Sequence, residues 1–112
     1  MKILIVDDDK EIVELLSIYS KNEGYTVIQA YDGDEALKKM VDHPDVNLII
    51  LDIMMPRMDG IKTCMRIRET DNIPIIMLSA KGEDSDKILG LNVGADDYIA
   101  KPFSVKEVIA RV

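Results

Sequence analysis

Residues 48–56 read Leu-Ile-Ile-Leu-Asp-Ile-Met-Met-Pro, an apolar run that is interrupted by one carboxylate, Asp52. A continuous run of Leu and Ile is typical of a strand that is covered on both faces, as in a parallel sheet. Pro56 and the later pair Asp59-Gly60 predict that the strand ends here and the chain turns. Ligands bind beyond the carboxyl ends of the strands in open α/β sheets, so Asp52 is expected at a binding edge.

Other segments around this strand alternate between strand and helix patterns. Strands are expected at residues 2–6, 26–30, 73–78 and 98–100, with helices at about 10–23, from Asp32 to Pro44, at 60–70, around Ile88 and Leu91, and from Ser104 onward. Short right-handed crossovers of this kind give a parallel sheet with helices on both faces. The predicted fold is therefore α/β and doubly wound, a flavodoxin-like five-stranded parallel sheet of order 2-1-3-4-5.

Two helices have apolar faces that can be predicted from helical spacing. The face of the first helix is expected to consist of Ile12, Leu15, Leu16 and Tyr19. The inner face of the second helix is expected to consist of Ala36, Leu37, Met40 and Val41.

Length and composition restrict the function. The chain has 112 residues, which suits one domain, and a net charge of -7, which argues against a nucleic-acid-binding surface on this segment. It has a single cysteine and no apolar run long enough to span a bilayer, so a reducing cytoplasm and no membrane contact are expected. The sequence stops at Arg111-Val112 inside a helical pattern, and we expect residues 1–112 to be the N-terminal domain of a longer chain.

Polar side chains end four of the five expected strands: Asp7 with Asp8, then Asp52, Ser79 and Lys101. In the predicted strand order these ends converge at one edge of the sheet. Carboxylates brought together repel one another unless a cation intervenes, and oxygen ligands of this kind suit Mg²⁺ together with a phosphate. With a hydroxyl and a lysine added, the set predicts a site for a phosphoryl group, with Asp52 as the nucleophile.

The same residues resemble a known family, the receiver domain of bacterial two-component response regulators, and most of all its OmpR/PhoB-type winged-helix class. The resemblance covers essentially the whole chain, and its matching segments occur in the family's order and spacing. These segments are Ile5-Val6-Asp7-Asp8, Leu51-Asp52-Ile53-Met54-Met55-Pro56, Met58-Asp59-Gly60, Leu78-Ser79-Ala80, Gly94-Ala95-Asp96-Asp97-Tyr98 and Lys101-Pro102-Phe103.

The resemblance implies a signalling switch in which Asp52 accepts a phosphoryl group from a sensor histidine kinase. Asp8, Asp52 and the backbone carbonyl of Met54 would hold Mg²⁺, with Asp7 contributing through water and Mn²⁺ as an alternative ion. The domain would promote its own phosphotransfer and dephosphorylation with this ion, without being an enzyme for another substrate.

Three further residues receive roles from the resemblance. Lys101 would contact the phosphoryl oxygens, and Ser79 would move to donate a hydrogen bond to one of them. Tyr98 would then swing inward, so that Ser79 and Tyr98 form the switch.

The resemblance also implies a symmetric homodimer through the fourth helix, fifth strand and fifth helix. Lys87 is expected to pair with Glu107, and Asp97 with Arg111, across the two-fold axis. Transcription would be controlled by a C-terminal DNA-binding domain that is not part of this sequence, so DNA is a partner only through that domain. The full predicted surface comprises Lys87, Ile88, Leu91, Asp96, Asp97, Glu107, Ile109 and Arg111.

Plainer interpretations remain beside these. Asp7, Asp8 and Asp9 are also suited to capping a helix, Tyr98 to a static core, and the charged set to an ordinary solvated face. A Mg²⁺-dependent phosphatase or phosphotransferase of the haloacid dehalogenase type also forms an aspartyl phosphate, but it needs a second acid two residues after the nucleophile, where this chain has Met54. A receiver-like binding module that never turns over phosphate is the third alternative.

Overall fold

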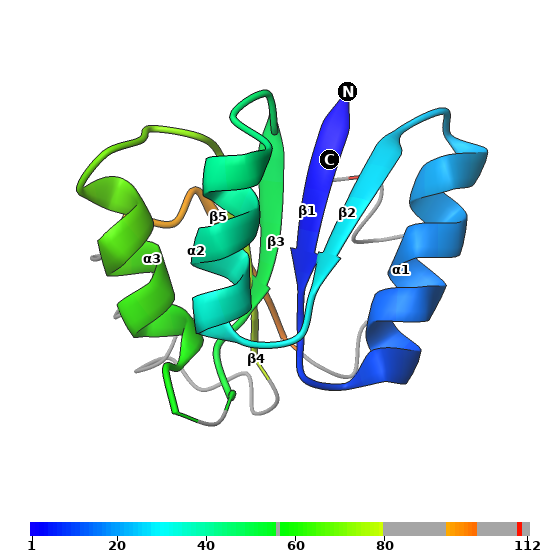
Figure 1. Cartoon of the computed structure of the whole chain (residues 1–112). Coiled ribbons are helices and arrows are strands. Elements are labelled where there is room, and N and C mark those ends of the chain that lie inside the picture. Colours follow the sequence, from blue (N-terminus) through cyan, green and yellow to red (C-terminus); the bar gives the residue numbers. More distant parts are fainter. Residues whose placement is uncertain (56, 80–93, 101–109, 111–112) are drawn as a thin grey trace.

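The computed structural model describes residues 1–55, 57–79, 94–100 and 110. These residues form a parallel sheet in the order β2-β1-β3-β4-β5, which confirms the predicted fold and strand order (Figure 1). The strands are β1 (Lys2–Val6), β2 (Thr26–Ala30), β3 (Leu48–Asp52), β4 (Ile75–Ser79) and β5 (Asp97–Ala100).

The central strands are apolar on both sides because both faces of the sheet are covered. Every residue of β3 and of β4 is buried, and so are the last four residues of β1. The side chains of each strand alternate between two apolar clusters, one on each face. Leu4 and Ile49 belong to one cluster, and Ile3 and Ile50 to the other. The continuous Leu/Ile run of β3 therefore has a direct structural explanation.

Three helices pack on the sheet within the described part of the chain. Figure 1 shows α1 (Lys10–Asn22) on one face and α2 (Gly33–Asp42) with α3 (Gly60–Arg68) on the other. Each helix begins after an aspartate whose carboxylate accepts backbone N–H groups of the first turn, which is a favourable N-cap. These caps are Asp9, Asp32 and Asp59.

The predicted apolar face of α1 is confirmed for Leu16, which is buried, and for Ile12, which is partly buried against the core, but it is wrong for Leu15 and Tyr19. Leu15 and Tyr19 are 46% and 38% exposed, whereas the helix buries Val13, Leu16, Ser17 and Ser20. Ser17 tolerates burial because its hydroxyl donates to the Val13 carbonyl at 2.6 Å and accepts from the Gln29 side chain at 2.8 Å. Small serines facing the sheet let the helix approach closely, and the larger side chains turn outward.

Smaller corrections concern the ends and faces of the other elements. Val41 is 80% exposed, so it does not belong to the inner face of α2, while Ala36 is buried there as predicted and Leu37 and Met40 pack against the same cluster. Strand β4 begins at Ile75 rather than residue 73, because Pro74 has no N–H to donate. Helix α3 ends at Arg68, earlier than predicted.

The helices predicted around Ile88 and after Ser104 lie outside the described residues. Within the described ranges, none of the helices has the length and apolar character needed to cross a membrane.

Candidate functional site at the carboxyl edge of the sheet

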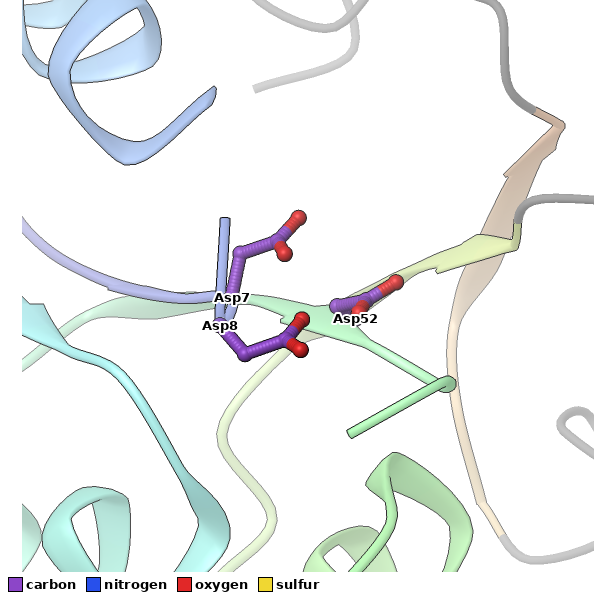
Figure 2. A group of neighbouring side chains, drawn as sticks. All are labelled: Asp7, Asp8 and Asp52. Carbon is purple, nitrogen blue, oxygen red and sulfur yellow. The ribbon is translucent and has the colours of Figure 1, made fainter. Parts of the chain in front are cut away.

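The carboxyl ends of β1 and β3 bring three aspartates together. Asp7 follows the last residue of β1, and Asp52 is the last residue of β3. The two strands are neighbours, and Val6 pairs with Leu51, so Asp7 and Asp52 are adjacent across the sheet. Figure 2 shows the side chains of Asp7 and Asp8 extending from the end of β1 toward the side on which Asp52 lies.

One carboxylate oxygen from each of these aspartates lies within 4.8 Å of the others. Asp7 is 0% and Asp52 1% exposed, whereas Asp8 is exposed to solvent. Buried carboxylates are costly unless they are paired, hydrogen-bonded or bound to a cation. The arrangement, with two buried acids and one at the surface, is one that could hold a metal ion that enters from solvent.

The consecutive aspartates after β1 have different local roles. The Asp7 backbone N–H donates to the Ala30 carbonyl at 3.2 Å, which continues the sheet, and the Asp7 carboxylate accepts the Asp9 N–H at 3.0 Å. Asp9 turns its own carboxylate to the N–H groups of Glu11 and Ile12 and caps α1. The capping interpretation therefore applies to Asp9, and Asp7 and Asp8 belong to the acid cluster.

Gly60 holds α3 directly against the backbone of Asp52. The Gly60 N–H donates to the Ile53 carbonyl at 2.8 Å, and the Ile53 N–H donates to the Leu78 carbonyl at 2.9 Å. A Cβ atom added at Gly60 would lie 2.7 Å from the Ile53 Cα and 2.8 Å from the Asp52 carbonyl carbon. These contacts fix the backbone of Asp52 between β4 and α3. Sequence analysis used Asp59-Gly60 as a turn signal and as part of a family motif, and neither predicted this close contact.

Ser79 ends β4 beside this edge. It is fully buried, and the pairing of Asp52 with Leu78 places Ser79 one residue further along the neighbouring strand. Met54, two residues past Asp52, has a side chain that is 55% exposed. Lys101 follows the last residue of β5 in sequence, but it lies outside the described residues, as does the placement of the Tyr98 ring.

Most of the predicted dimer surface also lies outside the described residues, and only Asp96 and Asp97 can be placed. Asp97 begins β5 and pairs with Ile76 of β4. The Asp96 carboxylate accepts the Ile75 N–H at 2.9 Å and forms an ion pair with Arg68 at 3.0 Å. Asp96 thus has intramolecular partners, and its role between two protomers stays a prediction.

Arg68 is a structural residue that sequence reasoning missed. Besides Asp96, its guanidinium donates to the Gly94 carbonyl at 2.9 Å and to the Ile73 carbonyl at 2.6 Å. Its side chain is 17% exposed. One arginine therefore joins the end of α3 to the segments that lead into β4 and β5, and its position in the last helical turn was the only sequence signal.

Two groups away from the acid cluster have a shifted pKa. Burial raises the pKa of the Cys64 thiol, and Arg68 partly opposes that shift. The hydrogen bond from Lys2 lowers the pKa of Asp45. Cys64 is fully buried in α3, which suits a packing residue better than a reactive thiol.

Comparison with known proteins agrees with this geometry. Residues 3–112 match the family described as the response regulator receiver domain. The chain is 54% identical over 113 residues to the alkaline phosphatase synthesis transcriptional regulatory protein PhoP of Bacillus subtilis (strain 168), covering 99% of this chain and 46% of PhoP. It is 52% identical over 111 residues to the regulatory protein VanR of Enterococcus faecium, covering 99% of this chain and 48% of VanR.

A solved structure provides a similar match. The structure of the CheX–CheY–BeF₃–Mg²⁺ complex from Borrelia burgdorferi contains a chain that superposes with a TM-score of 0.93 at 38% identity, covering 99% of this chain and 85% of that one. The chain belongs to the response regulator receiver domain family. It spans about half the length of the curated relatives it matches.

Proposed function

We propose that this receiver domain accepts a phosphoryl group from a sensor histidine kinase onto Asp52 and thereby controls transcription through a DNA-binding domain elsewhere in a longer protein. The observation that carries the proposal is the cluster of Asp7, Asp8 and Asp52, whose oxygens lie within 4.8 Å of one another at the carboxyl edge of the sheet. The name of the PhoP relative, a transcriptional regulatory protein, supports the same output.

Asp52 is the acceptor because its surroundings suit a nucleophile better than those of its neighbours. Asp8 is exposed to water, and Asp7 lies one residue past the end of β1. Asp52 is 1% exposed and its backbone is held by α3 and β4, so its carboxylate is oriented before a donor arrives. Such pre-organisation lowers the entropic cost of the transfer.

The donor set fits Mg²⁺, with Mn²⁺ as an alternative. Hard cations of this size take oxygen ligands, usually one or two carboxylates, waters and a phosphate. Asp8, Asp52 and the Met54 carbonyl would hold the ion, and Asp7 would act through water. When bound, the ion supplies positive charge that offsets both the clustered acids and the incoming phosphoryl oxygens.

In the transfer, the P–N bond to the kinase histidine breaks while a P–O bond forms to a carboxylate oxygen of Asp52. The departing imidazole takes a proton from solvent. The Lys101 ammonium would contact the phosphoryl oxygens, and the Ser79 hydroxyl would donate to one of them. Hydrolysis of the resulting acyl phosphate by water would restore Asp52 and release inorganic phosphate, so the switch resets itself.

The signal would pass from Ser79 along β4 to β5 and its neighbours. Drawing the Ser79 hydroxyl toward the phosphoryl group would leave room for Tyr98 to move inward and alter the surface that dimerises. Cross-protomer pairs between Lys87 and Glu107, and between Asp97 and Arg111, would stabilise the dimer. The partners of this cycle are a sensor kinase, a second copy and, through the additional domain, DNA in the cytoplasm.

The test is the intact mass after incubation with Mg²⁺ and acetyl phosphate, a small donor that needs no kinase. We expect the wild type to gain one phosphoryl group and Asp52→Asn to gain none. Asp9→Asn is a matched control, because asparagine also caps helices well and Asp9 lies outside the cluster. Equal phosphorylation of Asp52→Asn and the wild type would refute Asp52 as the acceptor.

A further inference from the structure

Helix α3 has a charge opposite to that of the chain as a whole. Its residues include Lys62, Arg66 and Arg68 and no acidic residue, while the 112-residue chain has a net charge of -7. Arg68 is engaged internally, but Lys62 and Arg66 are exposed. Among the residues that the structure describes, no carboxylate lies within ion-pairing distance of either one.

Lys62 and Arg66 are four residues apart, so they share one face of α3. Like charges at this spacing repel each other and destabilise a helix unless an anion lies between them. Met65 lies on the same exposed side of the helix, with 52% of its surface open. A basic and partly apolar helix face is therefore presented to solvent.

This face borders a surface groove between α2 and α3. The wider part has a volume of about 480 Å³ and is lined in part by Met58, Lys62, Met65 and Arg66. A second hollow of about 210 Å³ shares Arg66 and is lined by apolar side chains of α2. Those side chains are Leu37, Met40 and Val41.

Other charged groups line the groove beside Lys62 and Arg66. Arg57, 77% exposed, adds a third cation to the lining and lies 3.9 Å from Asp32. Three acids also line the two hollows: Asp34 in the first turn of α2, and Glu69 and Asp71 after the last residue of α3. Within the described residues none of the three forms an ion pair with Lys62 or Arg66.

We propose that the α2–α3 groove docks an acidic amphipathic helix of a partner protein. Carboxylates one turn apart on that helix would pair with Lys62 and Arg66, and its apolar stripe would pack on Met58 and Met65. Helix-in-groove recognition uses this combination of spaced anchors and an apolar floor. A protein segment fits better than a nucleic acid, because the net charge of -7 repels a phosphate backbone and bases would not explain the apolar lining.

The test uses a synthetic helical peptide of Glu, Leu and Ala, with glutamates at i and i+4 beside a leucine stripe. The peptide is titrated into the ¹⁵N-labelled 112-residue chain. We expect saturable amide shifts confined to residues 34–41 and 57–70. A peptide with glutamine in place of every glutamate should bind at least about tenfold more weakly, the ratio that corresponds to about 1.4 kcal/mol.

Two single charge reversals, which give variants of equal net charge, test whether the peptide binds at the α2–α3 groove. Lys62→Glu should lower the affinity for the acidic peptide at least about tenfold, a loss of about 1.4 kcal/mol in binding free energy. It should also fold normally, since an acid in the first turn of a helix is favourable. Lys21→Glu, on the exposed side of α1, should change the affinity less than about twofold.

The proposal is overturned by any of three results: no saturable shift, shifts centred on another face, or equal loss in both variants. A single-stranded DNA oligonucleotide that competes for the same amides would assign the groove to nucleic acid instead and would also overturn it. Phosphorylation of Lys62→Glu by acetyl phosphate should match the wild type, so failure of this proposal can be distinguished from failure of the receiver function.

Discussion

Replacing Gly60 with alanine tests how the acceptor aspartate is held. The added Cβ atom would lie 2.7 Å from the Ile53 Cα and 2.8 Å from the Asp52 carbonyl carbon, and closer still to the Asp52 carbonyl oxygen. All of these are backbone atoms, so no flexible side chain can move aside. Either α3 shifts outward and loses the bond from Gly60 N–H to the Ile53 carbonyl, or the end of β3 moves.

The expected cost follows from this geometry. Overpacking that shifts backbone costs about 1–3 kcal/mol. The lost hydrogen bond adds about 1 kcal/mol, and the better helix propensity of alanine returns about 0.5–1 kcal/mol. The net loss of about 1–3.5 kcal/mol should lower the melting temperature by roughly 4–17 °C in a domain of this size. Circular dichroism during thermal unfolding measures the shift.

Gly24→Ala is the matched control for this variant. Gly24 has a φ of 87°, but no atom lies within 4 Å of the position that a Cβ would take, so alanine there meets conformational strain without a clash. We expect a loss of about 1 kcal/mol and no effect on phosphorylation of Asp52. A melting temperature for Gly60→Ala within about 2 °C of the wild type would show that α3 does not rest on the Asp52 backbone.

Three further outcomes are expected. In EDTA, Asp8→Asn should have a higher melting temperature than the wild type because one repelling carboxylate is gone. Mg²⁺ at ten times its Kd should raise the melting temperature of the wild type by roughly 4–8 °C and that of Asp9→Asn equally, but should hardly change that of Asp8→Asn. An equal rise in Asp8→Asn would contradict the metal site. Arg68→Lys should lower the free energy of unfolding in urea by about 2–3 kcal/mol, because one ammonium cannot reach the Gly94, Ile73 and Asp96 oxygens together. An unchanged urea midpoint would argue against this network. Burial raises the pKa of the Cys64 thiol, so the folded state keeps its proton at a pH where the unfolded state ionises. The free energy of unfolding should therefore fall as pH rises through the pKa of the unfolded state. The thiol should react with Ellman's reagent only on unfolding, and rapid reaction of the native protein would contradict its burial.

The sequence was sufficient to predict the sheet and the acid cluster. Apolar runs of Ile, Leu and Val define the strands, and the carboxyl ends of parallel strands must meet at one edge. An aspartate at the end of the third strand and two after the first are therefore brought together by topology alone. The order of the strands came from the flavodoxin-like arrangement that alternating strands and helices favour, because periodicity alone leaves the order open.

Which side of α1 faces the sheet could not be predicted in the same way. The sets beginning at Ile12 and at Val13 have the same i, i+3, i+4, i+7 spacing, and hydrophobicity favours the first. The helix nevertheless buries Ser17 and Ser20, because Gln29 of β2 satisfies the Ser17 hydroxyl and small side chains allow close packing. That reason lies in a tertiary contact between segments that are distant in sequence.

The roles of Gly60 and Arg68 were hidden for a similar reason. Gly60 looks like a turn residue in sequence, yet it is needed because α3 approaches the Asp52 backbone too closely for a Cβ atom. Arg68 looks like a favourable last-turn cation, yet its guanidinium bridges loops up to 28 residues away. Close approaches and buried hydrogen-bond networks depend on the packed structure, so local patterns do not reveal them.

The most direct test of the central claim identifies which carboxylate carries the phosphoryl group. The protein is incubated with acetyl phosphate, with and without Mg²⁺, reduced with borohydride, and digested for peptide mass mapping. Reduction converts an aspartyl phosphate to homoserine. We predict homoserine at Asp52 alone, and only when Mg²⁺ is present. Homoserine at Asp7 or Asp8, or at Asp52 to the same extent in EDTA, would contradict the account.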